Sequence, residues 1–258
     1  GATVTVREGG TTRCTDVCSS SAYSCVSNQM TAGSKTITRT QTDPAGNTSG
    51  GSTSGFTIDV TAPSAPTITT PVAFSYTNDN TVSVTGTCET STQMYVRDNA
   101  DTLLCTAVCS GGTYGCVTSA LADGGRTIHA ESVDLANNIS SSADRNFFVD
   151  TVAPSAPGAT LPASGALVNT LTPTFTGTCE SSAIVTMKEG ATTRCTSTCT
   201  SGTYSCVSNT MTSGSKTITR TQTDLAGNIS GGTTSGFTID VTAPAPTVPW
   251  RANTLQEP

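Results

Sequence analysis

The chain repeats itself at an interval of about 90 residues, and every copy carries the same pattern of cysteines. Cys14 recurs at Cys105, 91 residues further on, and again at Cys195, 90 residues beyond that. The two cysteines that follow each of these recur with them: Cys18 and Cys25, Cys109 and Cys116, Cys199 and Cys206. An interval of this length is a whole small domain, so the chain is predicted to be an array.

Two of the copies carry a further cysteine upstream, in Gly86-Thr87-Cys88 and Gly177-Thr178-Cys179. We therefore predict a partial domain at residues 1–60 that lacks its first strands, and two whole domains at residues 61–150 and 151–241. Residues 242–258 then read as the first strand or linker of a following domain. The first and third copies resemble each other most, since residues 35–43 and 216–224 are identical.

Composition excludes several classes of partner. The 258 residues carry a net charge of −6, and only 12% of them are charged. Nucleic acids and anionic membranes are bound through basic patches, so neither is an expected partner. The sequence contains no run of 18 apolar residues, so no membrane insertion is predicted for this segment.

Short stretches in which apolar residues alternate with Thr and Ser fill each copy, and this period of two is the signature of half-buried strands. In the middle copy they lie at residues 67–69, 81–85, 94–96, 103–109, 114–117, 127–133 and 145–149. Seven short strands separated by turns predict an all-β fold of tandem immunoglobulin-like β-sandwiches.

Each copy ends in a short junction rich in proline. The junctions are Asp59-Val60-Thr61-Ala62-Pro63, Asp150-Thr151-Val152-Ala153-Pro154 and Asp240-Val241-Thr242-Ala243-Pro244. Proline restricts the backbone, so a stiff rod is predicted in preference to beads on a flexible string.

Several of these strings together resemble a known family. They are Gly-Thr-Tyr204-Ser-Cys, Asp-Leu-Ala226-Gly227-Asn228, Leu121-Ala122-Asp123-Gly124 and the junction at residues 148–154. The chain is similar over residues 1–244 to the bacterial immunoglobulin-like repeats of large surface adhesins and extracellular fibres. This resemblance implies a location that is extracellular, at the cell surface or secreted. Most such repeats lack cysteines and have Trp where this chain has Tyr23, Tyr114 and Tyr204, so it is a cysteine-rich variant.

Eleven cysteines at fixed spacings predict disulfides and an oxidising compartment. A zinc site with four thiolate ligands is the alternative, although short Cys-x2-Cys knuckles are missing. Because Cys109 and Cys116 flank a turn, we expect them to face each other across a hairpin. The predicted pairs are Cys88–Cys105, Cys109–Cys116, Cys179–Cys195, Cys199–Cys206 and Cys18–Cys25. The crossed pairing Cys88–Cys116 with Cys105–Cys109 is the alternative.

This pairing leaves Cys14 unpaired or bonded to another subunit. One explanation is that its partner lies upstream in a longer chain. The other is assembly, in which residues 242–258 act as a donor strand that completes the first domain of an identical subunit. Val248, Trp250 and Leu255 are then candidate interface residues.

The other polar residues suggest little chemistry. Asp59, Asp150 and Asp240 are weak calcium candidates, because calcium prefers oxygen ligands, but turn capping explains them as well. Asn47, Asn138 and Asn228 lie in Asn-x-Ser/Thr sequons that the turn at each position also explains. His129 is the single histidine, and its counterparts are Thr38 and Thr219, so no catalytic residue and no enzyme are predicted.

The sequence therefore predicts the structural repeat region of an extracellular bacterial surface fibre, stalk or filament without a cofactor. Its partners are predicted to be neighbouring immunoglobulin-like domains or identical subunits. One alternative is an adhesin module that binds a glycan or a protein of a host or neighbouring cell. The other alternative is a subunit that polymerises head to tail by strand complementation.

Overall fold

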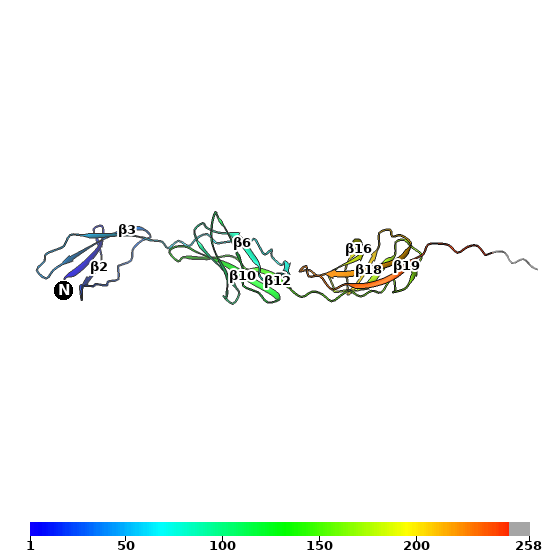
Figure 1. Cartoon of the computed structure of the whole chain (residues 1–258). Helices are drawn as coiled ribbons and strands as arrows, with labels where there is room; N and C mark the ends of the chain where they lie inside the picture. Colours follow the sequence, from blue (N-terminus) through cyan, green and yellow to red (C-terminus); the bar gives the residue numbers. More distant parts are fainter. Residues whose placement is uncertain (248–258) are drawn as a thin grey trace, which may run out of the picture. The chain divides into compact units, whose positions relative to one another are not determined.

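The computed structural model of the chain describes residues 1–247, and every regular element in this part is a β-strand (Figure 1). No helix in these residues is long and apolar enough to cross a membrane. By compactness the chain forms two units, one made of Gly1–Ala73, Val82–Ser119 and Thr127–Asn146, the other of Phe74–Thr81, Ala120–Arg126 and the chain from Phe147. The division falls inside the middle repeat, and the domain boundaries at residues 60, 150 and 241 stay a prediction.

The first unit begins with a four-stranded antiparallel sheet in the order β2-β1-β3-β4. Its strands are β1 (Thr3–Glu8), β2 (Thr11–Val17), β3 (Gly33–Thr42) and β4 (Ser52–Ile58). No second sheet covers it within the described part of the first repeat, and this distinguishes it from the other two repeats.

The middle repeat has two sheets, in the orders β5-β12-β10-β7-β8 and β6-β9, with β11 added against β10. Their strands are β5 (Tyr76–Thr77), β6 (Ser83–Thr87), β7 (Gln93–Asp98), β8 (Leu103–Val108), β9 (Thr113–Val117), β10 (Gly124–Val133), β11 (Ile139–Ser141) and β12 (Arg145–Val149). On β6, β7, β10 and β12 buried residues alternate with less buried ones, as Met94 and Val96 do on β7, so the predicted period of two is confirmed there.

The third repeat has the same two-sheet arrangement in the second unit, in the orders β13-β19-β18-β15-β16 and β14-β17. Its strands are β13 (Leu167–Val168), β14 (Thr174–Thr178), β15 (Ile184–Glu189), β16 (Thr192–Thr198), β17 (Thr203–Val207), β18 (Gly214–Thr223) and β19 (Thr233–Ile239). Phe175 and Tyr204 of the small sheet pack with Val185, Ile218 and Phe237 of the large sheet in one buried cluster. The predicted immunoglobulin-like sandwich is therefore confirmed.

Five disulfides form, but the predicted pairing is wrong. The structure has Cys14–Cys25, Cys88–Cys109, Cys105–Cys116, Cys179–Cys199 and Cys195–Cys206, and leaves Cys18 as the free thiol. The predicted Cys88–Cys105, Cys109–Cys116, Cys179–Cys195, Cys199–Cys206 and Cys18–Cys25 bonds are absent, and so is the crossed alternative. Cys14, expected to be unpaired or bonded to another subunit, is bonded to Cys25 of the same repeat. With ten cysteines in disulfides, no repeat keeps the thiolates that a four-cysteine zinc site needs.

The physical reason lies in the turn between β8 and β9. A hairpin pairing of Cys109 with Cys116 requires that this turn join neighbours in one sheet, but β8 lies at the edge of the large sheet and β9 in the small one. Cys105 and Cys116 therefore face each other between the two sheets, with 6.0 Å between their Cα atoms. Cys88, which follows β6, reaches Cys109, which follows β8, over a Cα–Cα distance of 6.0 Å. Each whole repeat thus has its two sheets joined twice.

The glycine of the Gly-Thr-Cys string is required by close packing. A Cβ atom on Gly177 would lie 2.0 Å from the carbonyl oxygen of Gly158 and 2.6 Å from the hydroxyl of Tyr204. Gly86 is similarly enclosed by Thr67 and Tyr114. Backbone atoms cannot retreat as a flexible side chain can, so only glycine fits at this position.

We expect Gly177→Ala to lower the free energy of unfolding of the third repeat by about 1–3 kcal/mol, the usual cost of overpacking. Chemical denaturation of the oxidised chain measures this, and hydrogen exchange at the amides of β14 and β17 locates it. Gly231→Ala is the control, because a Cβ atom there meets nothing within 4 Å. Equal effects of the two substitutions would contradict the packing argument.

Candidate functional site

A turn built on one aspartate and one asparagine occurs in every repeat. In the third repeat, Asp224 Oδ1 accepts the backbone N–H groups of Ala226 (2.9 Å), Gly227 (2.8 Å) and Asn228 (2.9 Å). Asn228 Nδ2 donates to Asp224 Oδ2 at 2.9 Å. The pairs Asp43–Asn47 and Asp134–Asn138 repeat the side-chain contact at 2.8 Å. These carboxylates therefore satisfy a whole loop of backbone donors.

The same asparagine also holds the linker that enters its repeat. Asn228 Nδ2 donates to the carbonyl oxygen of Asp150 at 2.7 Å, and Asn138 Nδ2 donates to that of Asp59 at 3.3 Å. In the third repeat, Gln222 Nε2 adds a bond to the carbonyl of Ser155 at 2.6 Å. The junction is thus fixed by side chains of the repeat that follows it, which the sequence analysis did not predict.

This geometry accounts for the three sequons. Asn228 is buried, and its Nδ2 group donates one hydrogen bond to Asp224 and one to Asp150. Attachment of a glycan to Nδ2 would replace one of its two hydrogens. The turn explains these asparagines without glycosylation, as expected from the sequence, and the bond to Asp150 is a second role that gives Asn228 its place.

The three junction aspartates form local turns. The Oδ1 atoms of Asp59, Asp150 and Asp240 accept the N–H groups of Thr61 (3.0 Å), Val152 (3.1 Å) and Thr242 (2.9 Å). A carboxylate that bonds the backbone two residues ahead is an Asx turn, which is the alternative that the sequence analysis gave. Calcium binding at these residues stays a prediction.

His129 lies near two carboxylates that the sequence did not associate with it. The ligand atoms of Asp101, His129 and Glu131 lie within 4.8 Å of one another. Glu131 Oε2 already accepts from Arg97 Nε at 2.8 Å, so this cluster contains its own cation. Asp101 comes from the turn between β7 and β8, and the pairing of β7 with β10 places that turn near His129.

The three repeat tyrosines have different environments. Tyr114 and Tyr204 are buried and donate to the carbonyl oxygens of Thr67 (3.0 Å) and Gly158 (2.9 Å). Burial raises the pKa of Tyr114 to about 12. These two tyrosines are therefore part of the buried core of their repeats. Tyr23 remains 37% exposed.

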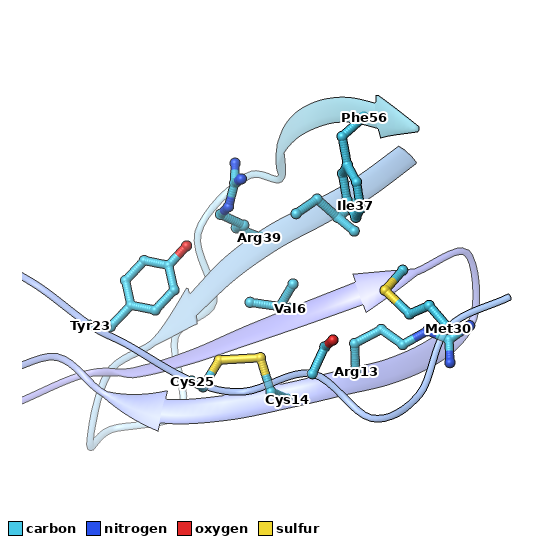
Figure 2. Close-up of a pocket in the computed structure, with 10 residues that line it drawn as sticks. Val6, Arg13, Cys14, Tyr23, Cys25, Met30, Ile37, Arg39 and Phe56 are labelled. Carbon is cyan, nitrogen blue, oxygen red and sulfur yellow. A yellow bond between two sulfur atoms is a disulfide. The ribbon is translucent and has the colours of Figure 1, made fainter. Parts of the chain in front are cut away.

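Tyr23 borders a hollow of about 240 Å³ on the open face of the first sheet (Figure 2). Val6, Ile37, Phe56, Arg39 and the Cys14–Cys25 disulfide also line it. Phe56 is 42% exposed, whereas Phe237, its counterpart in the third repeat, is 2% exposed. The first repeat therefore presents to solvent the face that forms the core of a complete repeat.

Val248, Trp250 and Leu255, the candidate interface residues, lie outside the described residues. The proposed donor segment 242–258 is described only as far as residue 247.

One repeat of the chain is similar to a known family of domains. Residues 161–241, the greater part of the third repeat, match the family model of the bacterial Ig-like domain. The predicted resemblance to bacterial immunoglobulin-like repeats is thereby confirmed, and the five disulfides agree with a cysteine-rich variant. No protein with a curated function matches the chain.

Two solved structures are similar to the chain at low sequence identity. The fibronectin type III-like modules of CbhA from Clostridium thermocellum are 17% identical, with a TM-score of 0.49 over 67% of this chain and 93% of theirs. The BSP domain of a biofilm-associated protein is 18% identical, with a TM-score of 0.29 over 82% of this chain and 43% of its own.

The aspartate turn predicts a pH-dependent contribution to stability. Burial opposes ionisation of Asp224, but hydrogen bonds from Asn228 and the turn outweigh it and lower the pKa of Asp224 from 3.8. A carboxylate whose pKa is lower in the folded state than in the unfolded state stabilises the fold at any pH above its unfolded pKa. This contribution is lost as the pH falls through the folded-state pKa. We expect Asp224→Asn to cost about 1–2 kcal/mol at pH 7, since it removes charge-assisted hydrogen bonds.

Denaturant titrations of both chains at pH 7 and at several values below 3.8 measure this difference. It should shrink as the pH falls, because the wild-type carboxylate becomes protonated. Asp144→Asn, at an exposed residue, is the matched control and should have little effect at any pH. A difference that stays constant with pH would contradict the assignment.

Proposed function

We propose that this chain is a structural repeat region of an extracellular bacterial surface fibre, stalk or filament, and that it supplies rigid, disulfide-stabilised reach. The observation that carries the proposal is the fixation of the linkers. The asparagines of two successive repeats hold the carbonyl oxygens of Asp59 and Asp150, in each case at the start of a proline-containing junction. A linker bonded in this way loses the freedom that a flexible tether needs.

The disulfides support the same role and location. In the loop-entropy relation, closing the 11-residue separation between Cys195 and Cys206 contributes about 2.8 kcal/mol. The 20-residue separation between Cys179 and Cys199 contributes about 3.3 kcal/mol. Disulfides of this number are maintained in oxidising surroundings, which supports an extracellular or cell-surface location. A role in mechanics and spacing needs no catalytic residue, and we assign none.

Small-angle X-ray scattering of the full oxidised chain tests the rigid linker. We expect one narrow distribution of maximum dimensions for the wild type. Asn228→Ala removes the bond to Asp150 and should broaden that distribution without unfolding the repeats, as judged by circular dichroism. Asn169→Ala, at an exposed residue outside the turn, serves as the control. A wild-type chain as flexible as the Asn228→Ala variant would contradict the proposal.

A second candidate function, adhesion, is favoured by one surface of the middle repeat. Phe74 is 68% exposed, and the ring of Tyr76 stacks on that of Phe148 with 4.7 Å between centroids. The third repeat has Gly165, Leu167 and Thr238 in these places. An exposed aromatic group that varies between copies suits recognition of a sugar ring better than a uniform spacer does.

Retention of the full chain on insoluble cellulose, xylan and chitin tests this candidate. If the surface binds sugar rings, Phe74→Ala and Tyr76→Ala should each abolish retention, whereas Leu167→Ala in the third repeat should leave it unchanged. Absence of retention by the wild type on all three polysaccharides would remove the support for sugar recognition and leave the structural role standing.

A further inference from the structure

In the other two repeats, a strand covers the face that is open in the first repeat. In the third repeat β14 lies antiparallel to β17, with Phe175 opposite Cys206 and Gly177 opposite Tyr204. The middle repeat repeats this pairing with Val84 opposite Cys116 and Gly86 opposite Tyr114. Residues 22–26, which correspond to β17, form no strand in the first repeat. The backbone of this segment is therefore free of the neighbour that both other repeats have.

The arginine that lines the hollow indicates which type of side chain would pack in it. Arg220 is fully buried in the third repeat, and its guanidinium carbon lies 5.6 Å from the centre of the Phe175 ring. Arg39 is its counterpart in the first repeat and lines the hollow beside Tyr23 (Figure 2). The middle repeat has Ala130 at this position and Val84 in place of the phenylalanine. An arginine here is therefore matched with an aromatic ring, and an alanine with a smaller side chain.

Tyr23 determines which residue of a bound strand can lie opposite it. In both complete repeats the residue opposite the tyrosine is a glycine, and a Cβ atom there would lie 2.7 Å (Gly177) or 2.8 Å (Gly86) from the ring and still closer to a backbone carbonyl oxygen. The hydroxyl of Tyr23 has no hydrogen-bond partner in the described chain, whereas Tyr204 donates to the backbone of Gly158. A strand that covers Tyr23 thus needs glycine two residues after its aromatic residue.

Gln41 and Cys18 of the first repeat also lack the partners that their counterparts have in the third repeat. Gln222 Oε1 accepts the backbone N–H of Glu180 at 2.9 Å, directly after Cys179. Gln41 is the counterpart of Gln222 and is exposed, whereas the middle repeat has Ser132 there. Cys199 is bonded to Cys179, and its counterpart Cys18 is the one free thiol among the cysteines.

We propose that the open face of the first repeat binds a β-strand of the type Phe-Thr-Gly-Thr-Cys-Glu, and that Cys18 then forms a disulfide with the cysteine of that strand. The strand is supplied by polypeptide outside these 258 residues, because β14 is already paired and residues 242–258 contain neither glycine nor cysteine. The bound strand lies antiparallel to residues 22–26, with its phenylalanine under Arg39 and its glycine against Tyr23. The proposal is independent of the structural role proposed above.

The covalent step is a thiol–disulfide exchange. The Cys18 thiolate attacks the sulfur of the strand's cysteine while that cysteine is joined to a second thiol in a mixed disulfide. The new sulfur–sulfur bond forms, the old one breaks, and the departing thiolate takes up the proton that Cys18 lost. If both cysteines begin as thiols, a small-molecule disulfide accepts the two electrons and two protons and leaves as two thiols.

The chain provides its own matched pair of test peptides. One has the sequence of residues 172–180, Thr-Pro-Thr-Phe-Thr-Gly-Thr-Cys-Glu, and the other that of residues 81–89, Thr-Val-Ser-Val-Thr-Gly-Thr-Cys-Glu. Each is prepared as the mixed disulfide with 5-thio-2-nitrobenzoate and added to the oxidised full chain. Release of the coloured thiolate gives the rate, and peptide mapping gives the site. We expect the first peptide to modify Cys18 about tenfold faster than a scrambled peptide, because binding raises the local concentration of its disulfide.

Two substitutions separate recognition from the reactivity of an exposed thiol. Arg39→Ala should remove the preference for the phenylalanine peptide over the valine peptide while leaving the rate with free 5,5′-dithiobis(2-nitrobenzoate) unchanged. Cys18→Ser should abolish the covalent product but retain binding of the first peptide, detected as protection of the amides of residues 22–26 from hydrogen exchange. Equal rates for the first and scrambled peptides would overturn the proposal. A Cys18–Cys18 dimer that excludes both peptides would overturn it as well, because a second copy would then be the occupant.

Discussion

The structure of each complete repeat depends on covalent joining of a small sheet to a large one. The small sheet of the third repeat consists only of β14 and β17, and a two-stranded sheet is marginally stable alone. Cys195–Cys206 ties β17 to the edge strand β16, and Cys179–Cys199 ties the segment after β14 to the end of the same edge strand. A small hydrophobic cluster between the two sheets is then sufficient, because the disulfides keep the two sheets connected even in the unfolded chain.

Between the middle and third repeats, three neighbouring core positions differ together. Phe175, Arg220 and Gln222 occur together in the third repeat, and Val84, Ala130 and Ser132 replace them together in the middle one. The buried guanidinium of Arg220 leaves Nε and Nη2 without a hydrogen-bond partner and has the face of Phe175 as its neighbour. Replacing Phe175 by a smaller residue would leave the buried charge of Arg220 without the aromatic ring beside it. The three positions therefore change as a group.

The strands and the sandwich could be predicted from the sequence because alternating burial is a local property of the chain. The disulfides could not, since pairing depends on which sheet each strand joins. Cys109 and Cys116 look like partners across a hairpin, yet β8 and β9 belong to different sheets. The partial copy lacks the Gly-Thr-Cys cysteine, so one of its three cysteines was expected to lack a partner, but the spacing does not distinguish Cys14 from Cys18. The contact between Asn228 and Asp150 had no signal in the sequence, because 78 residues separate them.

The pairing of the cysteines has a topological consequence for a protein exposed to proteases. The loop closed by Cys179–Cys199 overlaps the loop closed by Cys195–Cys206, so every peptide bond between residues 179 and 206 lies inside at least one ring. A single cut anywhere in that stretch opens a ring without releasing either piece. The side-by-side pairing first expected from the sequence would have left the segment between Cys195 and Cys199 outside both rings. The interlocked arrangement therefore lets a repeat be nicked once and remain in one piece.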